Sequence, residues 1–287
     1  MYSTIVVGYD ESESSKAALK EASLRVKNRN GKLYLVHAVY FDQEEFAILP
    51  SQMEKRFEAG THVCLMAKKE LSEQYSLNGN IESFVCEGEP SAVLTDIAQG
   101  KKADLIALGT YGRKGLKRLL MGSVTSEVIL GAPCDVLVVK RPCAECTGSY
   151  QSILVPFDGS EYSTKAMARA VAMAKTDGGQ VTVLYVIPRY EEMVEFYRSE
   201  TIRKSLASEA ERVIGEAKKI ADAAGVTVRT EIREGHAADE IVNAAAKLEN
   251  DLIAMGTYGW KGVSKAIMGS TTNRVIAHAN CPILVVK

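Results

Sequence analysis

Short apolar runs rich in β-branched residues alternate along the chain with longer stretches in which apolar residues recur at helical spacing. In the first half the apolar runs predict strands at residues 4–7, 32–39, 81–86, 104–108 and 135–139. The stretches between them predict helices at 14–27 and 52–74, and a third that begins at Pro90, a residue suited to a first helical turn, and runs to about Ala98. The near-continuous hydrophobicity of the strands predicts that helices cover both faces of their sheet.

The second half repeats this order of elements. Its apolar runs predict strands at residues 152–155, 180–187, 227–232, 252–255 and 283–286. Strands that alternate with helices form parallel sheets with right-handed crossovers. The expected fold is therefore α/β, with two tandem doubly wound domains, each a five-stranded parallel sheet flanked by helices. Ligands of such sheets bind beyond the carboxyl ends of the strands.

The two halves are copies of one sequence. Residues 104–112 (DLIALGTYG) recur as 251–259 (DLIAMGTYG), and residues 137–140 (LVVK) recur as 284–287, both at an offset of 147. This period is far longer than that of a solenoid repeat, so each copy is expected to have its own core. The predicted domains are residues 1–141 and 151–287. Residues 142–150, with Gly and Ser after a Pro at 142, are predicted to be a short linker.

Composition and charge narrow the function classes. A chain that is 46% hydrophobic and 25% charged is not disordered, collagen-like or a coiled coil. The net charge of -1 gives no overall attraction to nucleic acid or anionic lipid. The sequence has no secretory leader pattern and no run of 18 apolar residues, and its six cysteines are irregularly spaced. We expect a cytoplasmic protein that binds neither nucleic acid nor membrane.

A glycine pattern follows the fourth strand of each copy and precedes a helical pattern. The spacing Gly-x2-Gly-x9-Gly-Ser is met by Gly109, Gly112, Gly122 and Ser123, and again by Gly256, Gly259, Gly269 and Ser270. Glycines allow positive φ and close approach of a backbone to a ligand, and the start of a helix offers free N–H groups to an anion. The spacing matches neither the P-loop nor the dinucleotide fingerprint. The alternative is that these residues merely cap a strand and a helix, but their identical spacing in two otherwise diverged copies favours phosphate binding.

An aspartate ends the first strand of each copy. Asp10 and Asp158 lie where a carboxylate can accept hydrogen bonds from a ribose diol. The alternative is a role in capping the helix that follows, because Asp-x-Ser/Gly-Glu is also a helix-start signal. Proximity to the glycine loop favours the ribose.

The glycine loops, the strand-end aspartates and the closing LVVK strands together resemble a tandem universal stress protein, and the resemblance covers nearly the whole chain. It implies an adenine nucleotide alpha hydrolase-like, Rossmann-like fold and an adenine-nucleotide-binding branch of the family. In the first copy the implied contacts are Asp10 and Gly109 to ribose, Ala38 to adenine, and Gly112, Gly122, Ser123 and Val124 to phosphates. In the second copy the matching residues are Asp158, Val186, Gly256, Gly259, Gly269, Ser270 and Thr271. The family's last strands pair across a dimer, which implies an intramolecular pseudo-dimer here, with a homodimer and a protein partner left open.

The two copies differ at several of these positions. Tyr185 stands where the first copy has His37, and Trp260 stands where it has Arg113. The first loop carries Arg113, Lys114, Lys117 and Arg118, whereas the second keeps Lys261 and Lys265. Because these charges could offset a triphosphate, the sequence predicts that the first site is the tighter for ATP. A run of charges is also typical of a solvated surface.

The sequence favours a nucleotide-binding regulator or sensor over an enzyme. Hydrolysis needs a group that positions water, usually together with Mg²⁺, and no distinctive set is visible. We interpret His37 as a packed residue and not a base, so slow ATPase activity is the most we expect. The ligand could be ATP, ADP or AMP, with Mg²⁺ accompanying ATP. The alternatives are a nucleotide-free scaffold that binds a partner, and a metal or redox module at Cys143 and Cys146.

Overall fold

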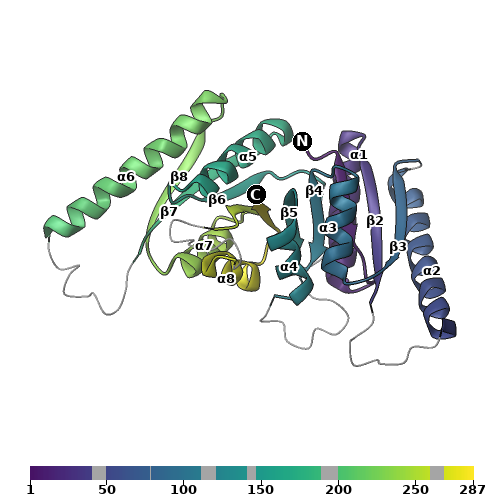
Figure 1. The fold of residues 1–287 in the computed structure, drawn as a ribbon. Coiled ribbons are helices and arrows are strands. Elements are labelled where there is room, and N and C mark those ends of the chain that lie inside the picture. Colours follow the sequence, from purple (N-terminus) through teal and green to yellow (C-terminus); the bar gives the residue numbers. More distant parts are fainter. Residues whose placement is uncertain (41–49, 78, 111–120, 141–146, 189–199, 259–267) are drawn as a thin grey trace. The chain divides into compact units, whose positions relative to one another are not determined.

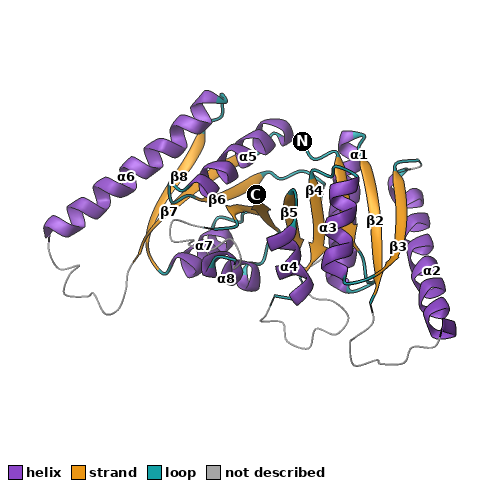
Figure 2. Cartoon of the chain, in the orientation of Figure 1, coloured by secondary structure: helices purple, strands orange, loops and turns teal. Residues whose placement is uncertain are grey.

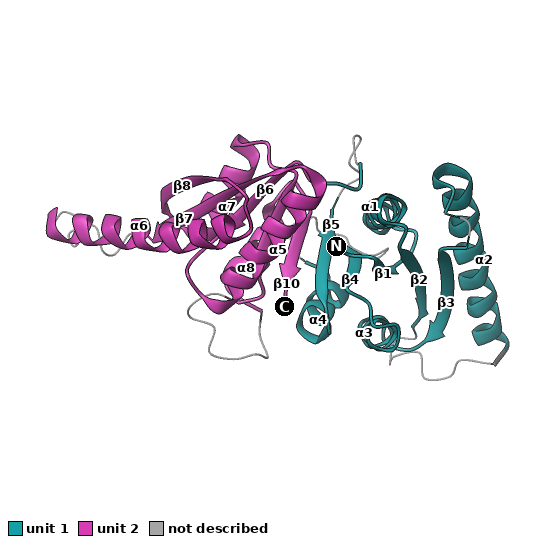
Figure 3. Cartoon of the chain, turned by 90° about the horizontal axis from the view of Figure 1, so that it is seen from above, with its two compact units in different colours: residues 1–149 teal, residues 150–287 magenta. Residues whose placement is uncertain are grey.

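The computed structural model describes residues 1–40, 50–77, 79–110, 121–140, 147–188, 200–258 and 268–287 (Figure 1). The chain divides into two compact units, Met1–Ser149 and Tyr150–Lys287 (Figure 3). Of the predicted linker, residues 142–146 lie outside the described residues. Thr147 belongs to the first unit, where its carbonyl accepts a hydrogen bond of 2.7 Å from Asn28 Nδ2.

The first unit is a parallel sheet with strand order β3-β2-β1-β4-β5. Its elements in chain order are β1 (Thr4–Gly8), α1 (Glu13–Arg29), β2 (Lys32–Val39), α2 (Pro50–Tyr75), β3 (Ile81–Glu87), α3 (Pro90–Gly100), β4 (Leu105–Gly109), α4 (Ser123–Gly131) and β5 (Asp135–Val139). Helices cover both faces: α1 packs beside α2 on one face, and α3 beside α4 on the other (Figures 2 and 3). The unit is therefore doubly wound.

The second unit repeats the architecture with strand order β10-β9-β6-β7-β8, again all parallel. Its elements are β6 (Ser152–Pro156), α5 (Glu161–Asp177), β7 (Gln180–Pro188), α6 (Glu200–Ala223), β8 (Val228–Gly235), α7 (Ala237–Lys247), β9 (Leu252–Gly256), α8 (Ser270–His278) and β10 (Ile283–Val286). The predicted α/β class, the parallel sheets and all ten predicted strands are confirmed, with ends that differ by at most a few residues.

The inner strands are as buried as their sequences predict. Every residue of β5, β9 and β10 is buried, as are the middle residues of β1 and β6. The prediction of cover on both faces is wrong for β3, where only Ile81 is buried, and no residue of the corresponding β8 is buried. Both are outer strands of their units, so among the described strands each has a neighbour along one edge only.

The helix that follows the first strand of each unit begins at a serine. Ser12 Oγ accepts a hydrogen bond of 3.2 Å from Ser15 N–H at the start of α1, and Ser160 Oγ accepts one of 3.2 Å from Ser163 N–H at the start of α5. Each hydroxyl satisfies a backbone donor that the helix itself leaves unpaired. These caps fix the direction in which each helix leaves the carboxyl edge of its sheet.

No helix in the described part of the chain is long and apolar enough to span a bilayer.

Candidate functional site

The predicted site residues of the first unit line up along the carboxyl edge of neighbouring strands. Ala38 is the second-last residue of β2, Asp10 follows β1, and Gly109 ends β4. Since β1 pairs with both β2 and β4, Asp10 lies between the other two. The start of α4 follows beyond β4. The second unit repeats this order with Val186, Asp158, Gly256 and the start of α8.

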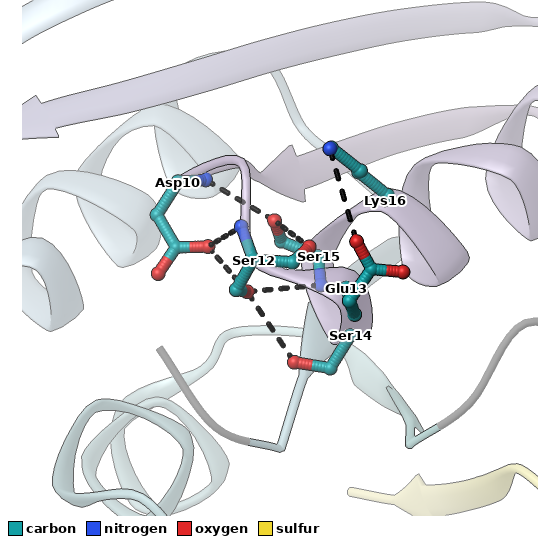
Figure 4. Close-up of polar contacts among 6 residues, drawn as sticks. All are labelled: Asp10, Ser12, Glu13, Ser14, Ser15 and Lys16. Atoms are coloured by element: carbon teal, nitrogen blue, oxygen red, sulfur yellow. Dashed lines mark hydrogen bonds and ion pairs between the residues drawn. The ribbon is translucent and has the colours of Figure 1, made fainter. Parts of the chain in front are cut away.

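Asp10 organises the turn that leads from β1 into α1 (Figure 4). Its Oδ1 accepts hydrogen bonds from Ser12 N–H (3.0 Å) and Ser12 Oγ (2.6 Å), while its own N–H donates to Ser15 Oγ (3.3 Å). In the second unit Asp158 Oδ1 accepts from Ser160 N–H at 3.0 Å. The helix caps are thus the serines, and each aspartate uses Oδ1 to order the turn before the cap. The alternative that the aspartates themselves cap the helices is therefore wrong, and their contact with a ligand stays a prediction.

The first glycine of each loop is required by helix packing. A Cβ on Gly109 would lie 2.4 Å from Ser14 Oγ and 2.7 Å from both Ser14 C and Ser15 N. On Gly256 it would lie 2.5 Å from Tyr162 Cβ and 2.9 Å from Tyr162 C. The absence of a side chain lets α1 and α5 approach the strand ends. Neither these two glycines nor Gly122 (φ −63°) and Gly269 (φ −57°) use the positive φ that glycine allows.

The far end of each loop is tied back to the strand that precedes it. Gly122 N–H donates to Thr110 O (3.0 Å), and Gly269 N–H donates to Thr257 O (3.2 Å). A second tie comes from α4 and α8, where Thr125 Oγ1 donates to Gly109 O (2.9 Å) and Thr272 Oγ1 donates to Gly256 O (3.1 Å). These two threonines were not predicted as site residues. Their identity in both copies is the sequence signal that could have revealed them.

The ties hold the starts of α4 and α8 at the carboxyl edge. Gly122 and Gly269 are the N-cap residues, and Ser123 with Val124, and Ser270 with Thr271, form the first helical positions. Backbone N–H groups in a first turn have no partner within the helix, and the helix dipole favours negative charge there. Ser123 and Ser270 are exposed, so these helix starts are chemically suited to an anion such as phosphate.

His37 packs beside this edge. Its Nδ1 is 2.8 Å from the carbonyl oxygen of Tyr9, to which it donates, and a Cβ on Gly60 of α2 would lie 2.8 Å from its Cδ2. These contacts support the interpretation of His37 as a packed residue. Burial raises the pKa of the neighbouring Tyr9 to about 12, with Glu11 adding to the effect. Tyr9 is therefore a neutral phenol near pH 7.

The second unit surrounds its site differently. Tyr162 and Tyr258 contact edge to face, with ring centroids 5.2 Å apart. On α6, Arg212 pairs with Glu209 at 2.6 Å and with Glu216. Burial, followed by Glu209 and Asp158, raises the pKa of Tyr185. The two sites therefore differ not only in His37 and Tyr185 but also in the aromatic and charged residues around them.

Several predicted residues lie outside the described residues: Gly112, Gly259, Arg113, Lys114, Lys117, Arg118, Trp260, Lys261, Lys265, Cys143 and Cys146. The described Cys64, Cys86, Cys134 and Cys281 are not joined in disulfide bonds. Within the described ranges no group of three or more His, Cys, Asp or Glu side chains could hold a metal ion.

Comparisons with known proteins agree on one family. The model of the Universal stress protein family matches residues 1–140 and again residues 149–287. A universal stress protein of Mycobacterium tuberculosis is 26% identical over 99% of this chain and 96% of its own length. One of Methanocaldococcus jannaschii is 38% identical over 140 residues, which are 48% of this chain and 82% of the relative. The crystal structure of a universal stress protein from Archaeoglobus fulgidus, 19% identical, matches with a TM-score of 0.71 over 100% of this chain and 99% of that one, which shows the same fold.

Proposed function

The chain belongs to the universal stress protein family, and from that premise we propose that each of its units binds an adenine nucleotide and that the bound nucleotide makes the protein a regulator or sensor in a stress response. The observation that carries the proposal is the order of groups along the carboxyl edge, repeated in both units. An apolar strand end, a strand-end aspartate and a helix start follow one another in the order of adenine, ribose and phosphate in a nucleotide.

Each of these groups suits its part of the ligand. Ala38 and Val186 offer backbone groups and small apolar surface to a base, and the carboxylates of Asp10 and Asp158 offer acceptors to a ribose diol. The N–H groups around Ser123 and Val124, and around Ser270 and Thr271, suit phosphate oxygens. These groups are compatible with ATP, ADP or AMP, and Mg²⁺ would add positive charge beside the phosphates of ATP.

Binding is favoured over rapid turnover. A base that activates water must reach the reacting phosphate, and His37 is turned instead toward the Tyr9 carbonyl and covered by α2 at Gly60. We therefore expect ATP hydrolysis to be well below an ordinary enzyme rate of about 1 per second.

Substitution of the strand-end aspartates tests the proposal because it separates their two roles. Asp10→Asn and Asp158→Asn keep an oxygen that can accept a hydrogen bond from the serine two residues on. The conformation of the turn and the melting temperature of the protein should therefore change little. The negative charge that would face the ribose is lost. A charge-assisted hydrogen bond is worth about 1.5–3 kcal/mol, so the affinity of the altered site for ATP should fall about 10- to 100-fold.

Calorimetric titration of the full chain with ATP, ADP and AMP measures that loss. Asp96→Asn, an exposed aspartate of α3, is the matched control and should bind as the unaltered protein does. Unchanged affinity in both aspartate variants would remove the ribose role. An unaltered protein that binds none of the three nucleotides would replace the proposal with the nucleotide-free scaffold.

A further inference from the structure

Thr110 is the first residue after β4 and lies directly before the glycine loop of the first unit. It is 1% exposed. Its backbone is fully engaged, since its N–H donates to Val139 O (3.2 Å) and its carbonyl accepts from Gly122 N–H (3.0 Å). Its hydroxyl is not engaged: within the part of the chain that the structure describes, buried Thr110 Oγ1 has no hydrogen-bond partner.

The second unit has the same residue at the same position with a different outcome. Thr257 is also 1% exposed, and its carbonyl also accepts from the loop glycine, Gly269 (3.2 Å). Its hydroxyl, however, donates to Val286 O at 3.2 Å. One hydroxyl is therefore paired within its own unit, and its repeat equivalent is not. A buried hydroxyl without a partner costs free energy, so the first unit retains a cost that the second avoids.

Thr110 lies at the point where β4 passes into the loop that leads to α4. Side chains alternate between the faces of a strand. A Cβ on Gly109 would run into α1, so this alternation predicts that the side chain of Thr110, one residue on, is directed away from α1. The tie between Thr110 O and Gly122 N–H brings this residue to the N-cap of α4. Thr110 is thus hydrogen-bonded through its backbone to the residue that caps the helix start whose N–H groups suit phosphate.

We propose that the Thr110 hydroxyl is a ligand-binding group reserved for a phosphate oxygen of the nucleotide, and that it makes the first unit the tighter of the two sites. The inference rests on the proposed function and deepens it. A phosphate oxygen of the ligand would accept a hydrogen bond from this hydroxyl. Binding would then remove the free-energy cost that the unpaired hydroxyl imposes on the ligand-free unit. Thr257 gains nothing comparable, because its hydroxyl would have to leave Val286 to reach a ligand.

Two matched variants test the inference because they should change the melting temperature of the ligand-free protein in opposite directions. Thr110→Val removes a hydroxyl without a partner and keeps the shape of the side chain, so the ligand-free protein should melt at the same temperature or a few degrees higher. Its tighter ATP site should weaken about 5- to 10-fold. Thr257→Val removes a hydrogen bond, so the ligand-free protein should melt a few degrees lower while the affinity of the tighter site stays unchanged. Thr110→Ser, which keeps the hydroxyl, should retain that affinity.

The measurements are thermal unfolding of the ligand-free full chain and calorimetric titration with ATP. If Thr110→Val lowers the melting temperature and leaves ATP affinity intact, the hydroxyl has a structural partner and the inference is overturned while the proposed function stands. If the unaltered protein binds no ATP, ADP or AMP, both are overturned. Equal loss of affinity from Thr110→Val and Thr257→Val would overturn the ranking of the two sites.

Discussion

Replacing Gly109 by Ala tests why the first glycine of the loop is there. The added Cβ would lie 2.4 Å from Ser14 Oγ and 2.7 Å from the backbone atoms Ser14 C and Ser15 N. Rotation of the serine could relieve the first contact but not the other two, so α1 must move away from β4. Overpacking of this kind typically costs 1–3 kcal/mol, and backbone contacts lie at the upper end, so we expect a loss of about 3 kcal/mol.

This loss corresponds to a fall in the melting temperature of the first unit of about 6–12 °C, because 1 kcal/mol shifts a unit of this size by about 2–4 °C. Thermal unfolding of ligand-free protein by circular dichroism measures it. Gly100→Ala, at the end of α3, is the control, since a Cβ there meets nothing within 4 Å and the change should be small. A Gly109→Ala protein that melts like the unaltered one but has lost ATP affinity would refute the reasoning and return this glycine to a purely ligand-contacting role.

Two further predictions concern the turn after β1. Glu11→Gly should raise the melting temperature by about 2–4 °C, because Glu11 adopts φ 64°, a left-handed conformation that costs an L-residue about 1–2 kcal/mol. The second copy has Gly159, with φ 79°, at the same position. An unchanged or lower melting temperature would contradict this prediction. Burial, aided by Glu11, raises the pKa of Tyr9 from 10.0 to about 12, so the folded state holds the proton more tightly, and this contribution to stability is present below about pH 10 and lost as the pH rises toward about 12. Tyr9→Phe should therefore lose less stability than the unaltered protein between pH 10 and 12 in urea unfolding series, and parallel curves for the two proteins would contradict the assignment.

The sequence predicted the fold because two independent patterns agreed. Apolar periodicity located the strands, and the internal repeat showed that the same order of elements occurs twice. The prediction failed for β3 and β8, since the degree of burial depends on where a strand lies in its sheet. Strand order is a tertiary property, and the apolar residues of β3 alone do not indicate an outer strand.

The sequence predicted the order of the groups along the candidate site but not the packing contacts that hold them there. Repeated spacing identified Gly109 and Gly256, yet the close approach of α1 and α5 to these glycines is visible only in three dimensions. Thr125 and Thr272 were overlooked because each is separated from the strand it contacts by the whole loop. The contrast between Thr110 and Thr257 could not be predicted at all, because the residues are identical and the structure distinguishes them by whether the hydroxyl has a hydrogen-bond partner.

The measurement that tests the central claim most directly is the identification of nucleotide released when freshly purified protein is denatured, by chromatography and mass spectrometry with the mole ratio per chain. The account predicts an adenine nucleotide at one to two per chain, with the first unit retaining its ligand the longer, so that Thr110→Val protein releases less. Finding none, followed by no thermal shift with added ATP, ADP or AMP, would contradict it, because a ligand that binds the folded state must raise its stability.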